Sequence, residues 1–292
     1  MNSCTLLVNE DTIEKMKVFY EDYLVKNTNL YVIFTAKTNE CVITAYTSKK
    51  VLFQGKNAEL EASIWANFTN PEFYLESIGS DEVGTGDYFG PVVVVSCYLS
   101  KDKLDVIKKL DIKDSKELTD EKIMKIAPIL YKELPYSLLV VDNKKYNEVM
   151  SKKDMNLNKL KALLHKQAIS NLLNRTNTKA VIIIDQFTPK ANFAKYTNDP
   201  HFTDQLYFTT KAESKYASVA CASIMARYKF LVEFTKLSKS VGMELHKGAS
   251  KIVENQAVML INTFGEEILP KIAKLHFKNT ASILNQTRKI QG

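Results

Sequence analysis

The chain has 292 residues, of which 45% are hydrophobic and 25% charged, as is ordinary for a globular protein with one large or two medium-sized domains. Its net charge of +7 permits an anionic partner without identifying one. No apolar run approaches the ~20 residues of a membrane span, and the N-terminus lacks the features of a secretory signal, so we expect a cytoplasmic protein. The four cysteines are far apart and form no Cys-x-x-Cys pair, which favours buried, reduced thiols.

The first segment, residues 1–70, is predicted to form a small α+β domain with its helices on one face of a sheet. A polar Thr-Asn-Pro-Glu stretch at 69–72 is typical of a linker to the rest of the chain. Apolar spacing and turn residues predict, in chain order, a helix over 11–26, strands over 30–35, 41–46 and 51–54, and a helix over 58–68.

The composition of this segment suggests a substrate-binding module. It carries seven lysines and eight acidic residues, a net charge of −1, so the rest of the chain carries +8. Aromatic and lysine side chains on one sheet face can grip the backbone or minor groove of a nucleic acid. Alternatively, the aromatic side chains are core and the lysines only keep the domain soluble. The candidates are Tyr31, Phe34, Tyr46 and Phe53, with Lys37, Lys49, Lys50 and Lys56.

The second segment, residues 71–292, alternates strands with helices. This alternation predicts an α/β sandwich around a mixed sheet. The expected strands are one that ends at Asp81 and those over 92–99, 136–141, 180–184 and 206–210. The expected helices lie over 119–134, 156–174, 214–238, 249–263 and 266–275.

An acidic pair followed by a glycine-rich turn is the most informative feature of the chain. Residues 79–91 read Gly-Ser-Asp-Glu-Val-Gly-Thr-Gly-Asp-Tyr-Phe-Gly-Pro and place Asp81 beside Glu82. Neighbouring carboxylates repel each other unless a cation neutralises them, and hard divalent cations prefer carboxylate oxygens. Gly84, Gly86 and Gly90 allow positive φ or a close approach of the backbone to a ligand. The stretch therefore predicts a metal site beside a closely approaching substrate.

Two further acids stand where they can join this pair. Asp185 ends the apolar strand Val-Ile-Ile-Ile, and open α/β sheets bind ligands at the carboxyl ends of their strands. Taken alone, Asp185 is better explained as a helix cap or turn former, and Glu213 is explained as an acid favoured at a helix N-terminus. Next to Asp81 and Glu82 we interpret Asp185 as part of a shared site.

The motif of residues 79–91 resembles the active-site motif of bacterial ribonuclease HIII, a type 2 ribonuclease H. The sister ribonucleases HII usually have an arginine where this chain has Thr85, and the Asp-Tyr-Phe-Gly insertion after Gly86 is also similar to HIII. Further similar stretches follow in order up to residue 280, so that the resemblance covers 77–280. The first segment resembles the extra N-terminal domain of HIII enzymes, whose fold is like half of the TATA-binding protein, most recognisably at Lys-Val-Leu-Phe-Gln-Gly, residues 50–55.

The resemblance implies a fold, an activity and a set of site residues. It implies an RNase H-like catalytic domain that cleaves the RNA strand of RNA–DNA hybrids with Mg²⁺ or Mn²⁺, with no obligate protein partner and as a monomer. The implied catalytic and metal-binding tetrad is Asp81, Glu82, Asp185 and Glu213, with Asp81 and Asp185 as direct ligands and the two glutamates bound either directly or through water. The implied substrate-binding residues are Gly84, Thr85 and Gly86 for the ribose 2′-hydroxyl, and Ser115, Lys116 and Lys247 for phosphates.

Other residues and other functions are weighed against this interpretation. His165, on the predicted helix 156–174, is expected to have a core or supporting role, and Trp65 to be core. An enzyme that incises at single embedded ribonucleotides is a second possibility, which Thr85 in place of arginine disfavours. A non-catalytic hybrid-binding protein is a third, and it predicts the loss of at least one of the four carboxylates, all of which are present.

Overall fold

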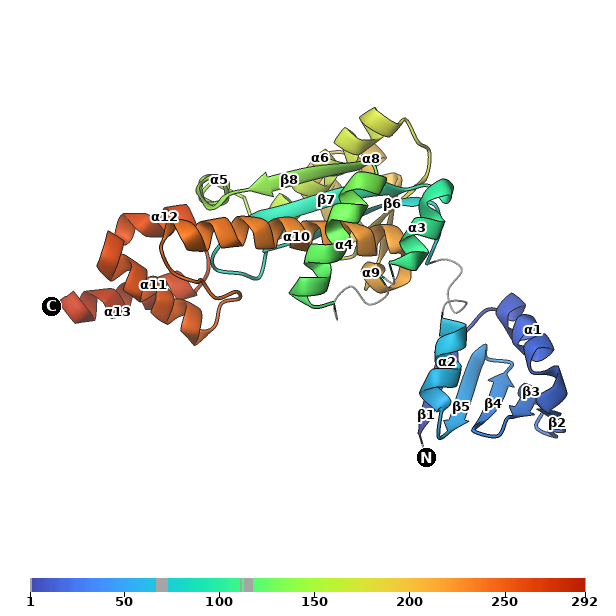
Figure 1. Ribbon diagram of the computed structural model, residues 1–292. Coiled ribbons are helices and arrows are strands. Elements are labelled where there is room, and N and C mark those ends of the chain that lie inside the picture. Colours follow the sequence, from blue (N-terminus) through green and yellow to red (C-terminus); the bar gives the residue numbers. More distant parts are fainter. Residues whose placement is uncertain (1, 67–72, 111, 113–117, 292) are drawn as a thin grey trace. The chain divides into compact units, whose positions relative to one another are not determined.

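The computed structural model describes residues 2–66, 73–110, 112 and 118–291, and the chain divides into two compact units, Met1–Tyr74 and Leu75–Gly292 (Figure 1). Each unit has a five-stranded sheet of its own. The linker expected at 69–72 lies outside the described residues.

The N-terminal unit is an antiparallel sheet in the order β1-β5-β4-β3-β2, with helices on one face. The expected central strands are present, but the helix predicted over 11–26 ends at Phe19, and a short 3-10 turn, Glu21–Tyr23, leads into β2. Strand β1, which was not predicted, pairs with β5, although most of the unit's sequence lies between the two strands. The elements are β1 (Ser3–Leu7), α1 (Glu10–Phe19), β2 (Leu24–Val25), β3 (Val32–Lys37), β4 (Cys41–Tyr46), β5 (Lys50–Gly55) and α2 (Ala58–Ala66).

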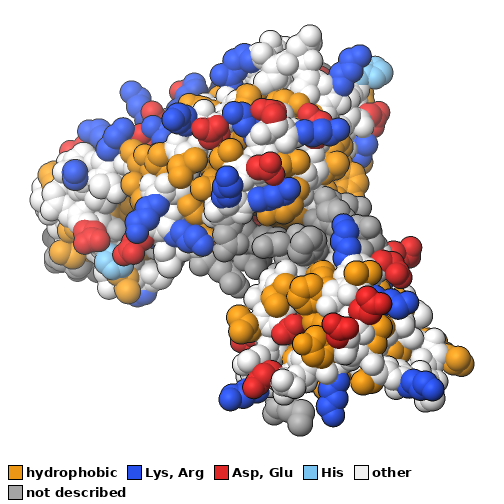
Figure 2. All heavy atoms as spheres, turned by 45° about the vertical axis from the view of Figure 1, so that its right-hand side comes forward, with side chains coloured by type: hydrophobic (Ala, Val, Ile, Leu, Met, Phe, Trp, Pro, Cys, Tyr) orange, Lys and Arg blue, Asp and Glu red, His pale blue; other side chains and the backbone are white. Residues whose placement is uncertain are grey.

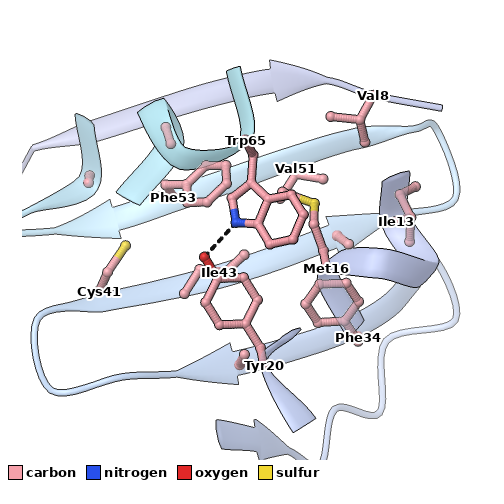
Figure 3. Close-up of a cluster of buried hydrophobic side chains, with 14 residues drawn as sticks. Val8, Ile13, Met16, Tyr20, Phe34, Cys41, Ile43, Val51, Phe53 and Trp65 are labelled. Carbon is pink, nitrogen blue, oxygen red and sulfur yellow. Dashed lines mark hydrogen bonds between the residues drawn. The ribbon is translucent and has the colours of Figure 1, made fainter. Parts of the chain in front are cut away.

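The core of this unit lies between the sheet and its two helices (Figure 3). Trp65 is 4% exposed, which confirms its predicted core position, and its indole Nε1 donates a hydrogen bond to the Tyr20 hydroxyl at 2.8 Å. Phe34 and Phe53 point into the same core, so the prediction that they share a surface with Tyr46 is wrong. Successive strand residues point to opposite faces, and both phenylalanines fall on the face that the helices cover.

The C-terminal unit is built on a mixed sheet in the order β10-β9-β6-β7-β8. Strand β6 is parallel to β9, and β9 to β10, whereas β7 runs antiparallel to both of its neighbours. The predicted mixed sheet is confirmed, and β6 is its central strand. The strands are β6 (Ser77–Val83), β7 (Val92–Leu99), β8 (Tyr136–Val141), β9 (Val181–Asp185) and β10 (Leu206–Thr209).

Two of the predicted helices of this unit begin at a residue whose side chain caps them. The side chain of Thr119 caps α4 and that of Asn156 caps α6, each by accepting a backbone N–H three residues on. The single helix predicted over 214–238 is two helices, because Tyr216 has an extended backbone. The helices are α3 (Leu104–Lys109), α4 (Asp120–Glu133), α5 (Asn143–Met150), α6 (Leu157–Thr176), α7 (Lys190–Thr197), α8 (Pro200–Asp204), α9 (Ala212–Lys215), α10 (Ala217–Ser240), α11 (Lys251–Phe264), α12 (Leu269–Ile272) and α13 (Asn279–Gln291), with 3-10 turns at Lys101–Lys103 and Glu266–Ile268.

Helices α6 and α10 cover opposite faces of the sheet (Figure 1). Ile78 and Ile182 pack on the α6 side, and Ile183 packs on the α9 and α10 side. Helix α10 lies directly against β6, because a Cβ built on Gly79 would overlap the backbone of Ser218. Gly79 thus lets the helix approach the central strand closely, a role that the sequence did not reveal.

Two general expectations are also met. All four cysteines are free, and three of them, Cys41, Cys97 and Cys221, are buried, as predicted. In the part of the chain that the structure describes, no helix is both long enough and apolar enough to span a bilayer.

Candidate functional site

Asp81 and Asp185 lie side by side at one edge of the sheet. Strands β6 and β9 are parallel, with Ser80 opposite Ile184, so that the next residue of each strand is an aspartate. Because side chains alternate along a strand, Asp81 shares the face of Gly79, and Asp185 shares the face of Ile183. Both carboxylates therefore leave the sheet on the side of α9 and α10, as the strand-end argument predicted.

Helix α9 adds Glu213 to these two aspartates. Lys211 precedes the helix with a φ of 54°, and the N–H of Ala212 donates to Asp185 Oδ1 at 3.0 Å. This contact ties the start of α9 to the end of β9. Glu213, the next residue, is only 6% exposed. The fold thus brings three of the four predicted acids together.

The electrostatics of Asp81 show how close these charges are. Burial, next the charge of Glu82 and last the charge of Glu213 together raise the pKa of Asp81 to about 7. Hydrogen bonds from Ser223 and from the N–H of Glu82, the latter at 2.9 Å, act in the opposite direction. The acids repel one another in a buried place, which is the condition that a cation relieves.

Glu82 points to the opposite face of the sheet, toward α6. Its Oε1 forms an ion pair with the ammonium of Lys161, and its Oε2 is 2.8 Å from His165 Nε2. Although burial raises the pKa of Glu82, His165 and Lys161 together bring it below its ordinary value. Lys161 and His165 are four residues apart and so share one face of α6. Sequence reasoning missed Lys161, whose spacing from His165 was the available signal.

His165 has the supporting role that the sequence predicted. The ring is 1% exposed, stacks on Phe187, and lies 2.7 Å from the Ser80 hydroxyl through Nδ1. The Ser96 hydroxyl donates to that of Ser80 at 2.7 Å. One tautomer of His165 satisfies this whole series of hydrogen bonds: Ser96 donates to Ser80, Ser80 donates to Nδ1, and Nε2–H donates to Glu82. These hydrogen bonds fix the orientation of the imidazole.

The donor set suits a hard divalent cation. Such ions take carboxylate oxygens, and Asp81, Asp185 and Glu213 supply them from one face of the sheet. Within the described residues, no three side chains of Asp, Glu, His or Cys already stand close enough together to chelate an ion. The pKa of Asp81 is raised first by burial and next by the charges of the neighbouring acids, and a bound cation would favour its ionised form.

The three glycines of the motif differ in what the fold requires of them. Gly84 has a φ of 94°, and a Cβ on it would overlap the Pro91 carbonyl. Gly90 has a φ of 81°, and its Cβ would stand 2.8 Å from the ring of Phe234. Gly86 is exposed and has an ordinary φ, and no atom of the described residues lies within 4 Å of a built Cβ. The fold explains Gly84 and Gly90, but it gives no reason for Gly86.

The insertion that follows the glycine turn is anchored to the C-terminal part of the chain. Asp87 Oδ1 accepts the N–H of Gly248 at 2.6 Å. Lys274 is completely buried and donates to the carbonyls of Asp87 at 2.8 Å and Gly90 at 2.5 Å. The burial of this ammonium was not predicted from the sequence.

Of the three residues predicted to contact phosphates, the structure describes Lys247. Ser115 and Lys116 lie outside the described residues. Lys247 is half-exposed and forms an ion pair with Asp120, to which Arg227 also donates at 2.7 Å. Lysine and arginine side chains are spread among acidic ones over the visible face of the C-terminal unit rather than gathered in one patch (Figure 2).

Comparisons with known proteins agree on the family. Residues 78–280 match the family model described as Ribonuclease HII, and residues 3–72 match a domain of unknown function, DUF3378. The chain is 44% identical to the ribonuclease HIII of Bacillus velezensis over 96% of each chain, and 43% identical to that of Bacillus cereus over 98% of this chain and 99% of the relative.

Solved structures of ribonucleases are similar as well. A crystal structure of Bst-RNase HIII in complex with Mn²⁺ is 38% identical with a TM-score of 0.75, covering 99% of this chain and all of the other. The ribonuclease H2 of Pyrococcus horikoshii is 25% identical with a TM-score of 0.60 over 74% of this chain. The full-length match confirms the predicted fold class, a small α+β, TATA-binding-protein-like domain followed by an RNase H-like domain.

Proposed function

The chain belongs to the ribonuclease HIII members of the type 2 ribonuclease H family, and from that premise we propose how its residues cleave the RNA strand of RNA–DNA hybrids. The observation that carries the proposal is the meeting of Asp81, Asp185 and Glu213 at one sheet edge. Such an acidic centre needs divalent cations before it can accept a polyanionic substrate. We name Mg²⁺ or Mn²⁺ as the cofactor, because the donors are oxygens.

Asp81 and Asp185 are the direct ligands in this proposal. The N–H of Ala212 holds one oxygen of Asp185 and leaves the other available. Glu213 contributes from the adjacent helix, directly or through water, whereas Glu82 lies on the other face of the strand, where Lys161 neutralises its charge. Two bound cations would supply an activated water and a stabilised leaving oxygen for phosphodiester hydrolysis.

The glycine turn is proposed to distinguish RNA from DNA. Recognition of a 2′-hydroxyl requires a group that comes close to the ribose. Gly86 offers an exposed backbone with open space where a side chain would stand, and Gly84 shapes the turn that presents it. Thr85 lies between them. Lys247 is proposed to contact phosphates, with Ser115 and Lys116 in the same role.

The N-terminal unit is proposed to bind the hybrid through the sheet face opposite its helices. Alternation along β3, β4 and β5 places Lys37, Tyr46, Lys50 and Gln54 on that face, and all but Tyr46 are exposed. Cationic and amide side chains beside one aromatic ring suit the backbone of a nucleic acid. We also propose that the enzyme works in the cytoplasm, as a monomer, in keeping with its four free cysteines.

The test is cleavage of a labelled RNA–DNA hybrid with Mg²⁺, with Mn²⁺ and with a chelator. Asp81→Asn and Asp185→Asn should each lose cleavage by several orders of magnitude while remaining folded by circular dichroism. Asp204→Asn, which changes an exposed aspartate paired with Lys190, is the matched control and should cleave like the parent. Full activity of Asp81→Asn, or cleavage in chelator, would refute the proposal. Substrates with one or four ribonucleotides separate this activity from incision at single ribonucleotides.

A further inference from the structure

The carboxylate of Glu82 is held differently from those of the neighbouring aspartates. Asp81 accepts hydrogen bonds from neutral donors, Ser223 and the N–H of Glu82, and Asp185 accepts the neutral N–H of Ala212. Both oxygens of Glu82 are instead engaged from α6, one by the ammonium of Lys161 and one by His165. A positive charge that belongs to the protein is therefore built into the acidic site.

The position of Lys161 is fixed by its surroundings. Its side chain is 12% exposed, as is that of Glu82, although lysines are seldom buried without a partner. The ammonium also lies 4.0 Å from the centroid of the Phe187 ring, which attracts a cation through its π face. Phe187 in turn stacks on His165, so that ring, imidazole and ammonium support one another.

We propose that Lys161 is the internal counter-cation of the acidic site: it holds Glu82 on the α6 face and, by its charge, weakens the binding of a divalent cation by Asp81, Asp185 and Glu213. Glu82 and Lys161 then act as a neutral pair, and Glu82 is not itself a ligand. The pair keeps the site from closing tightly on metal before substrate phosphates arrive. Lys161 is a positioning residue in this account. The inference rests on the proposed metal site.

A double-mutant cycle read by metal binding tests the pair. Mn²⁺ binding to the full-length protein without substrate is measured from the electron paramagnetic resonance signal of the free ion, at one fixed pH. Lys161→Met should bind Mn²⁺ roughly tenfold more tightly, because a unit charge about 10 Å from a divalent ion still exceeds thermal energy even at the dielectric constant of water. Glu82→Gln should bind it more weakly by a similar factor. The double variant should return close to the parent, since both changes together leave the net charge of the site unaltered.

Two controls separate charge from shape. Lys161→Arg keeps the charge and should bind Mn²⁺ like the parent. Lys166→Met removes a lysine from the same helix, where it pairs with Asp199 at 2.8 Å, and should leave the affinity unchanged. If Lys161→Met does not fold, Lys161→Gln takes its place in the cycle.

The outcomes also distinguish this inference from the site on which it rests. If Asp185→Asn binds Mn²⁺ as the parent does, the proposed metal site is wrong. If Asp185→Asn weakens binding but Lys161→Met does not tighten it, Lys161 has no counter-cation role. A double variant as weak as Glu82→Gln shows that Glu82 is a metal ligand, and it overturns the inference as well.

Discussion

Replacing Gly84 and Gly86 one at a time with alanine should separate what the glycine turn does for folding from what it does for catalysis. The two residues are two positions apart in one turn, yet their surroundings differ. Alanine at Gly84 must adopt a φ of 94° while its Cβ meets the Pro91 carbonyl and, at 3.0 Å, the ring of Phe230. Alanine at Gly86 meets nothing within 4 Å at an ordinary φ.

The magnitudes follow from these surroundings. A left-handed backbone costs a non-glycine residue about 1–3 kcal/mol, and overpacking adds about 1–3 kcal/mol. We therefore expect Gly84→Ala to lower the free energy of unfolding by about 4 kcal/mol. For a unit of this size, that corresponds to a Tm roughly 8–16 °C lower. Gly86→Ala should change stability by less than about 0.5 kcal/mol, as surface substitutions usually do.

Gly86→Ala, the substitution with the smaller expected effect on stability, should have the larger effect on catalysis. A methyl group on Gly86 would stand between the turn and a closely approaching ribose, and we expect kcat/KM for the hybrid to fall roughly 10- to 100-fold, about 1.4–2.7 kcal/mol. Scanning calorimetry measures the stability, and cleavage of a labelled hybrid at low substrate concentration measures kcat/KM. A Gly86→Ala enzyme with the parent's kcat/KM would refute the idea that this backbone contacts the sugar, and a Gly84→Ala protein with the parent's Tm would refute the steric argument.

Three further predictions concern the scaffold. Deletion of residues 1–70 should raise KM for the hybrid more than it lowers kcat, because the N-terminal sheet face binds but carries none of the proposed catalytic acids; an unchanged KM would contradict this. Gly79→Ala should destabilise the protein by about 3 kcal/mol or more in urea titrations, because its Cβ overlaps the backbone of Ser218, and a change below about 1 kcal/mol would show that α10 can move away. Burial lowers the pKa of Lys274 to about 7, below that of the unfolded chain, so above pH 7 the unfolded state binds the extra proton. The contribution of Lys274 to stability should therefore rise by roughly 1.4 kcal/mol per pH unit, until the pH nears the unfolded pKa of about 10.4. Lys274→Met should abolish that rise, and an identical slope in both proteins would count against the shifted pKa.

Much of the fold could be predicted because its signals are local. Apolar runs, β-branched in β7, predicted β7 and β8 with their observed bounds, and Thr119 and Asn156 marked the starts of α4 and α6. Strand β1 was missed because its five residues alternate between exposed and half-buried positions and gain their place only by pairing with β5, more than forty residues away.

The site also has a part that local signals predict and a part that they do not. The sequence by itself determined the acids at the ends of β6 and β9 and the glycines beside them, because a carboxylate after an apolar strand is a local pattern with a known place in an α/β sheet. Only the tertiary structure decided that Lys161 neutralises Glu82 and that Lys274 holds the glycine insertion. Those contacts join residues about 80 to 190 positions apart, and charge pairing in a buried interior depends on distance in space, which no local pattern records.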